Sequence, residues 1–239
     1  MIGRTVGVVA LLALWLAPPA IGQQPADEAG GAKDHAAAVK ESLQSSMAAI
    51  RQYQWVETTA VSLKGEEKSR SENSCYYGAD GKLQKTPVGA PAQDSGRKKR
   101  GVRGKVVENK TEEFSDAVNE AVSLIKQYVP PDPARIQAAK DAGRVTVSQP
   151  DANGHVHLVV ADYIKPGDSL TLDVDASSDR ISGVTISTFT DSAKDGVGLH
   201  VAYGSFADGT VYPATIRLDI AAQKLSVAIE NSGYKKLGG

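Results

Sequence analysis

Residues 208–231 read DGTVYPATIRLDIAAQKLSVAIEN, and this stretch decides the fold class. Apolar and polar side chains alternate along it, which predicts two strands, Thr210–Ile220 and Lys224–Glu230. Alternation places Ile216 and Leu218 on one face of the sheet and their polar neighbours on the other. The connection between the two strands is too short for a crossover, so we expect them to be antiparallel.

The same alternation continues upstream as far as residue 144. Turn-forming pairs such as Asn153-Gly154 and Asp195-Gly196 separate the segments. Further strands are expected at Val145–Ser148, His155–Tyr163, Ser169–Val174, Arg180–Thr190 and Gly198–Phe206. Near the N-terminus, an alternating run from Tyr53 to Leu63 and a second strand ending at Tyr77 predict a β-meander.

Helical periodicity occurs only in the N-terminal half. Apolar stripes at spacings of three and four predict helices over Lys33–Arg51 and Glu112–Tyr128. A short third helix is expected from Asp132-Pro133 to Gly143, with proline at its first position. Between strands and helices, residues 87–105 are rich in glycine and predict an exposed loop. Its basic cluster comprises Arg97, Lys98, Lys99, Arg100, Arg103 and Lys105.

These elements predict an α+β fold with one large antiparallel sheet. A sheet of nine or so strands twists and curls, so one face becomes concave. Because the strands alternate, that face is apolar and needs a cover. The N-terminal helix and a helical insertion at about 106–143 are the available cover.

The first 22 residues have the form of a cleavable secretory signal peptide. Arg4 precedes the apolar run VGVVALLALWL, and small residues follow Pro18 and Pro19. Residues 23–32 are expected to be a disordered tether, and no later segment reaches membrane-spanning length. Removing Arg4 leaves 26 basic and 28 acidic residues, a charge of −2, which gives no field that attracts nucleic acid. We therefore expect a periplasmic or secreted protein with no integral membrane segment and no nucleic-acid partner.

No motif in the sequence predicts catalysis. G-x-S-x-G, H-E-x-x-H and the phosphate-binding loop are all absent. His155 and His157 share one strand face and could contribute to a zinc or copper site, but a third ligand is needed, so solvated surface is the favoured interpretation. The single cysteine, Cys75, is expected to be buried and inert rather than to form a dimer. We expect no enzyme, no cofactor and no metal.

Three features resemble the LolA/LolB-like superfamily of periplasmic lipoprotein carriers. A signal peptide and amphipathic helix lead into Tyr53-Gln54-Trp55, a tyrosine-proline strand runs over 208–216, and a last alternating strand covers 224–231. The resemblance implies a single domain over 33–239, built as an unclosed half-barrel with helices on its concave face. It also implies a carrier without catalytic residues.

The implied function is to hold a lipid or an acylated protein in a hydrophobic cavity. The alternative is a dry core, in a protein that binds a cell-envelope partner through its basic loop (Arg97, Lys98, Lys99, Arg100, Arg103) or an edge strand. The candidate cavity-lining residues are Trp55, Val61, Phe114, Val118, Ile125, Leu170, Leu172, Val184, Ile186, Ile216, Leu218, Val227 and Ile229.

Overall fold

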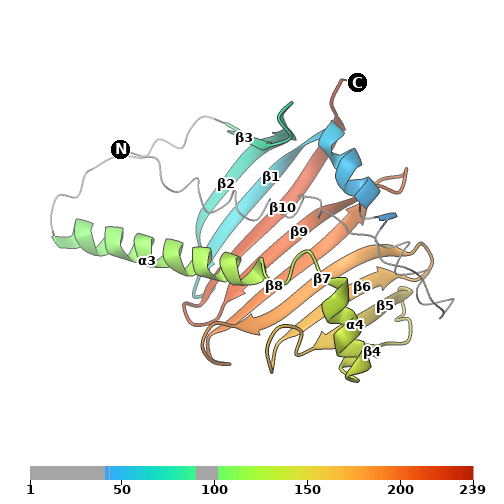
Figure 1. The fold of residues 1–239 in the computed structure, drawn as a ribbon. Helices are drawn as coiled ribbons and strands as arrows, with labels where there is room; N and C mark the ends of the chain where they lie inside the picture. The colour runs from blue at the N-terminus through green and yellow to red at the C-terminus, as the bar shows by residue number, and fades with distance from the viewer. Residues whose placement is uncertain (1–40, 43, 90–101, 239) are drawn as a thin grey trace.

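A computed structural model of the chain describes residues 41–42, 44–89 and 102–238, without the side chains of 102–113. One antiparallel sheet of ten strands dominates it, in the order β3-β2-β1-β10-β9-β8-β7-β6-β5-β4 (Figure 1). The strands are β1 (Tyr53–Leu63), β2 (Glu66–Tyr77), β3 (Leu83–Pro87), β4 (Val145–Val147), β5 (His155–Ala161), β6 (Ser169–Asp175), β7 (Arg180–Phe189), β8 (Gly196–Ser205), β9 (Val211–Ile220) and β10 (Leu225–Lys236).

The sheet is curved and stays open. The strand that comes first in the chain, β1, pairs with the one that comes last, β10. Thr59 of β1 lies opposite Ile229 of β10, and Val61 lies opposite Val227. This pairing joins the N-terminal meander to the C-terminal strands. Because the short strands β3 and β4 form the two edges, the predicted unclosed half-barrel is confirmed.

Cross-strand register arranges the apolar side chains of the concave face in two parallel rows. In the first, here called the covered row, strands β5 to β10 and β1 contribute Val160, Leu170, Ile186, Leu199, Leu218, Val227 and Val61. In the second, here called the flanking row, strands β4 to β10 contribute Val147, Leu158, Leu172, Val184, Val201, Ile216 and Ile229. Each row has one apolar residue per strand, so the face is continuous.

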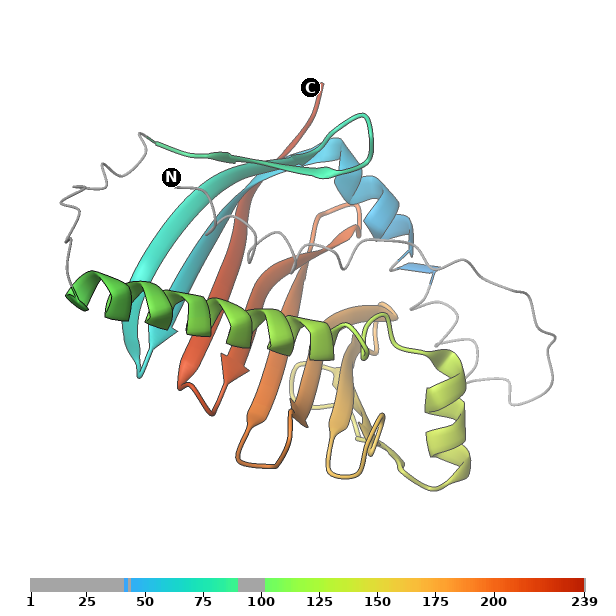
Figure 2. The ribbon, with the colours of Figure 1, turned by 60° about the vertical axis from the view of Figure 1, so that its left-hand side comes forward.

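Helix α3 (Val102–Ile125) crosses the strands on the concave side, near one end of the sheet (Figure 2). Its buried residues Val118, Ala121, Val122 and Ile125 belong to the same apolar cluster as the covered row. Packing of this stripe excludes water from that row and stabilises the layered fold.

The predicted bounds of α3 are wrong at both ends. The helix begins at Val102 rather than Glu112, so the expected loop 87–105 is helical in its last residues. Gly104 lowers helix propensity, but neighbouring lysine and glutamate residues favour it. At the other end, the helix stops at Ile125, and Tyr128 is fully buried just beyond it. The Tyr128 hydroxyl donates to Asp168 at 2.6 Å.

Helix α4 (Pro133–Asp141) packs beside β4 and β5, as the sequence predicts. The side chain of Asp132 caps it by accepting from the Ala134 amide at 2.9 Å. Near the N-terminus, residues 41–42 and 44–49 are helical and lead into the 3-10 turn Ile50–Gln52. Ser46 attaches this helix to the sheet, because its hydroxyl accepts from the Val211 amide at 2.8 Å.

Several predicted features lie outside the described residues: the signal peptide 1–22, the tether 23–32, the start of the first helix, and the basic residues Arg97, Lys98, Lys99 and Arg100. Arg103 is part of helix α3, and its side chain is among those that the structure does not describe. Among the described helices, none combines the length and the hydropathy that crossing a bilayer requires.

Candidate ligand-binding face

The structure places nearly all of the candidate lining residues on the concave face. Leu170, Ile186, Leu218, Val227 and Val61 are in the covered row, whereas Leu172, Val184, Ile216 and Ile229 are in the flanking row. Phe114, Val118 and Ile125 come from α3 and pack against the same cluster. Trp55 is buried apart from them. The candidates therefore form one surface, but not one cavity.

The covered row is a closed core. Leu170, Ile186 and Leu218 are 0 % exposed beside the packed stripe of α3. Side chains in such a core fill space to nearly crystalline density, which leaves no room for a hydrocarbon chain. A ligand could reach this row only if α3 moved away.

The flanking row is covered in part. Val184, Val201 and Ile229 are 1–3 % exposed and belong to the same core cluster, but the other members are more open, which makes this row the better candidate site. Its exposure increases toward the β4 edge, where Leu158 and Leu172 are half-buried and Val147 is 58 % exposed. Ile216 is half-buried as well. Sequence analysis missed Val147, Leu158 and Val201 as lining residues, because alternation gives the face of a residue but not its partner across the strands.

At β1 the concave face becomes polar. Thr59 continues the flanking row beside Ile229, and next to it Glu57 is 4 % exposed. Lys85 donates to both carboxylate oxygens of Glu57, at 2.6 and 2.7 Å. Trp55 donates from Nε1 to Asn231 at 3.1 Å. The apolar surface is thus bounded on this side by paired polar groups.

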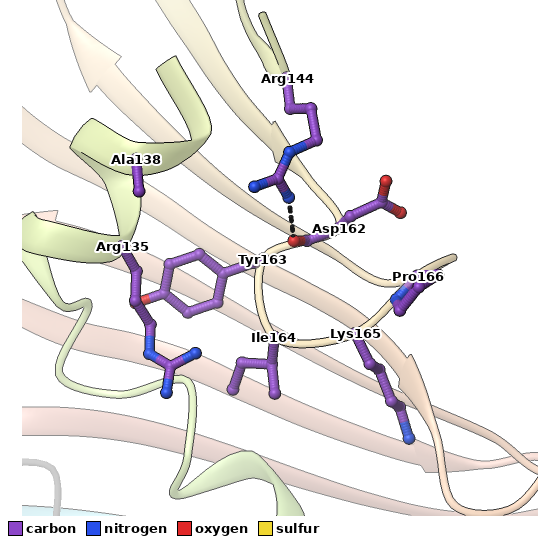
Figure 3. A pocket seen from close by; sticks show the side chains of 8 residues that line it. All are labelled: Arg135, Ala138, Arg144, Asp162, Tyr163, Ile164, Lys165 and Pro166. Atoms are coloured by element: carbon purple, nitrogen blue, oxygen red, sulfur yellow. Dashed lines mark hydrogen bonds between the residues drawn. The ribbon is translucent and has the colours of Figure 1, made fainter. Parts of the chain in front are cut away.

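Two hollows stand out in the described part of the chain, and neither is lined by the candidate residues. One is an open cleft of about 420 Å³ between α4 and the β5–β6 turn, and three of its lining residues are cationic (Figure 3). The other, of about 200 Å³, lies under α3 and includes Glu120, Asp191 and Asp195.

The two histidines of β5 lie beside carboxylates on the opposite, solvated face. His157 Nδ1 is 2.6 Å from Asp173, which is its partner in register on β6. This hydrogen bond raises the pKa of His157. Asp151 Oδ2 is 3.9 Å from both His155 and His157. Among the described residues, no three or more His, Cys, Asp or Glu side chains lie close enough together to hold a metal ion.

Cys75 is 0 % exposed on β2, where it pairs in register with Trp55 of β1 and Lys85 of β3. Burial, together with the charge of Glu57, raises the pKa of its thiol to about 12. The thiol is therefore protonated at neutral pH and poorly nucleophilic.

Several solved structures are similar to this one at low sequence identity and low TM-score. The structure is similar to that of a LolA superfamily protein from Nitrosomonas europaea, with 11 % identity and a TM-score of 0.35 over 84 % of this chain and 94 % of that one. A DUF1329 family protein from Desulfovibrio piger gives 8 % identity and a TM-score of 0.36 over the same shares.

A weaker similarity is to MucB in its complex with MucA from Pseudomonas aeruginosa, with 9 % identity and a TM-score of 0.20 over 86 % of this chain and 99 % of that chain. No family model and no curated protein matches the sequence.

Proposed function

We propose that the protein is a non-enzymatic carrier outside the cytoplasm, and that its flanking row holds the hydrocarbon chain of a lipid or an acylated protein. The observation that carries this proposal is the unbroken apolar register from Val147 to Ile229, half-open to solvent at several positions. Contiguous apolar surface of this kind marks binding sites in soluble proteins.

The dimensions of the flanking row suit an acyl chain. Six strand spacings separate β4 from β10. At about 4.8 Å each, the row is about 29 Å long. One leaflet of a bilayer has a hydrocarbon depth of about 15 Å, so an extended acyl chain is shorter than the row. The members open to it are Val147, Leu158, Leu172 and Ile216, whereas Val184, Val201 and Ile229 are buried. Each square ångström of apolar surface removed from water contributes about 25 cal/mol to binding.

Paired substitutions on neighbouring residues test the proposal. Ile216→Gln and Leu172→Gln introduce a polar group on the concave face, whereas the control variants Thr215→Gln and Thr171→Gln place the same side chain on the convex face. We expect a fluorescent fatty acid to bind the two concave variants at least tenfold more weakly than the controls.

Mass spectrometry of lipid extracts from the purified protein provides a second readout. If the protein carries no lipid, and the fluorescent fatty acid binds all four variants equally or not at all, then the carrier function is wrong.

One observation favours the alternative, a module that binds a cell-envelope protein. Within the described residues, β3 pairs with β2 only from Asn73 to Tyr77, so Glu66–Ser71 has a strand partner on one side only. Such an edge can accept a strand from another chain. Reversing the charges of residues 97–100 and Arg103, or placing proline in Glu66–Ser71, should then abolish pull-down of a partner without changing fatty-acid binding.

A further inference from the structure

The open cleft beside α4 is built from three separate segments. Arg135 and Ala138 come from α4, Arg144 directly precedes β4, and Asp162–Pro166 forms the turn after β5. Figure 3 shows the side chains of Arg135 and Arg144 on two sides of the Tyr163 ring. The volume of about 420 Å³ is within the usual range for small-ligand sites.

The cations of this cleft are held mainly by neutral groups. Arg144 donates to the carbonyl oxygens of Ala161 and Asp162, and Lys165 donates to those of Phe189 and Thr190. A carbonyl oxygen positions a cation without neutralising it. None of these contacts involves a carboxylate. The Lys165 ammonium also lies 4.0 Å from the centroid of the Phe189 ring.

The remaining charges leave the lining positive. Arg135 is half exposed and forms an ion pair with Asp132 at 3.8 Å, which at this exposure contributes little. The Asp162 carboxylate accepts from the Gly167 amide at 2.7 Å. Three cations and one carboxylate line the cleft, a formal sum of +2, which Asp132 beside Arg135 lowers to +1.

The floor of the cleft is apolar. Tyr163 is 5 % exposed, belongs to the core cluster, and has Ile164 packed beside it. The Asp132 amide donates to the Tyr163 hydroxyl at 2.6 Å, which fixes the ring. A cationic rim over an apolar floor is complementary to a molecule with an anionic head and an apolar tail.

The cleft also lies on the side where the flanking row is most exposed. Val147 and Leu158 are the β4 and β5 members of that row, and the cleft lies at the other end of the same two strands, with the paired residues Val145 and Val160 between the row and the cleft. Three residues, about 10 Å of strand, separate Val147 from Arg144. An amphiphile with its head at Arg135 and Arg144 therefore passes the half-buried Val145 at the β4 edge before its chain reaches the row.

We propose that this cleft binds the carboxylate or phosphate head of an anionic amphiphile whose hydrocarbon chain lies along the flanking row. The inference rests on the proposed carrier function and names the charge class of its ligand. Arg135 and Arg144 contact the head group, and Lys165 contributes to the positive field. Guanidinium groups suit this role because they bind planar carboxylates and phosphates with paired hydrogen bonds.

The test compares amphiphiles that share a chain and differ in head charge. Calorimetry measures the affinity of the wild-type protein for dodecanoate, dodecyl phosphate and dodecyltrimethylammonium, and for inorganic phosphate alone. We expect both anionic amphiphiles to bind at least tenfold more tightly than the cationic one. Inorganic phosphate is expected to bind far more weakly than dodecyl phosphate, because it lacks the chain.

Arg135→Gln is the informative variant, since Arg135 is exposed and its loss should not disturb folding. It should weaken dodecanoate binding three- to tenfold, whereas Lys140→Gln, also exposed on α4 but outside the cleft, should not change it. Unfolding temperatures of both variants verify that they fold.

The outcomes separate this inference from the carrier function. If the anionic and cationic amphiphiles bind equally and Ile216→Gln weakens both, the head-group site is wrong and the carrier function stands. If phosphate alone binds as tightly as dodecyl phosphate, the cleft takes free anions and the inference is overturned. If no amphiphile binds, the carrier function itself fails.

Discussion

At the scale of single residues, Cys75 shows how burial, with a neighbouring negative charge, suppresses the reactivity of a thiol. Its pKa is raised from 9.0 to about 12 by burial and by Glu57. At pH 8 the thiolate fraction in the native protein is then about a thousandfold lower than in the unfolded chain. We expect native Cys75 to be alkylated by iodoacetamide at least a thousandfold more slowly than in urea.

The alkylation rate of native Cys75 should also keep rising with pH up to about 12, because only the thiolate reacts. If the alkylation rate levels off near pH 9 while circular dichroism shows an intact fold, the thiol is not buried beside Glu57 as described.

Gly183 leaves room for the Asp173 carboxylate, which is hydrogen-bonded to His157. A Cβ atom at Gly183 would lie 2.5 Å from the Asp173 carboxylate, so Gly183→Ala forces this carboxylate to move. His157 then loses its hydrogen bond, and its pKa falls toward the ordinary histidine value. NMR titration of the imidazole measures the shift.

Asp173→Asn is the matched control for the Gly183 experiment, and it should lower the pKa of His157 in the same direction. If the pKa of His157 is unchanged in both variants, Asp173 is not the group that raises it.

At the scale of elements, the cap of α4 is a testable local determinant. Asp132→Ala removes the acceptor for the Ala134 amide and should lower the free energy of unfolding by about 1 kcal/mol. Asp132→Asn should cost little, because asparagine caps helices almost as well. Urea denaturation of the two variants measures the difference, and equal losses would show that the cap contributes nothing specific.

Periodicity predicts whether an element exists better than it predicts where the element ends. The alternation of Ile216, Leu218, Val227 and Ile229 correctly gives strands and their apolar face. The start of α3 was misplaced because Gly104 resembles a loop residue, although packing of Val118 and Ile125 farther along the helix stabilises the whole element. The helix propensity of the residues around Gly104 does not include the stabilisation that this more distant packing provides.

At the scale of the whole molecule, β10 is the strand that joins the two parts of the sheet. Ala228 is exposed and lies opposite Ala60 of β1 and Arg217 of β9. Proline at this position has no amide to donate and does not fit between two strands, so Ala228→Pro should lower the free energy of unfolding by about 2 kcal/mol or more.

Ala228→Val is the control, because a branched side chain suits an exposed strand position. Thermal unfolding followed by circular dichroism compares the two variants. Similar unfolding temperatures would show that the central pairing contributes little to stability.

Strand order and register explain what the sequence could not predict about the candidate site. Alternation identifies Val61 and Val227 as facing the same side of the sheet. Only the pairing of β1 with β10 makes them neighbours. The positive cleft was missed for the same reason, since Arg135, Arg144 and Lys165 come from three segments that the fold brings together.

The pairing of β1 with β10 has a consequence for biosynthesis. A nascent chain emerges from the ribosome with β1 first, and this strand has no neighbour on its β10 side until residues 225–236 have been made. Until then, an apolar strand edge is open to aggregation. The pairing that joins the two parts of the sheet can therefore form only when the chain is nearly complete, and a chaperone that binds extended segments should protect β1 and β2 until then.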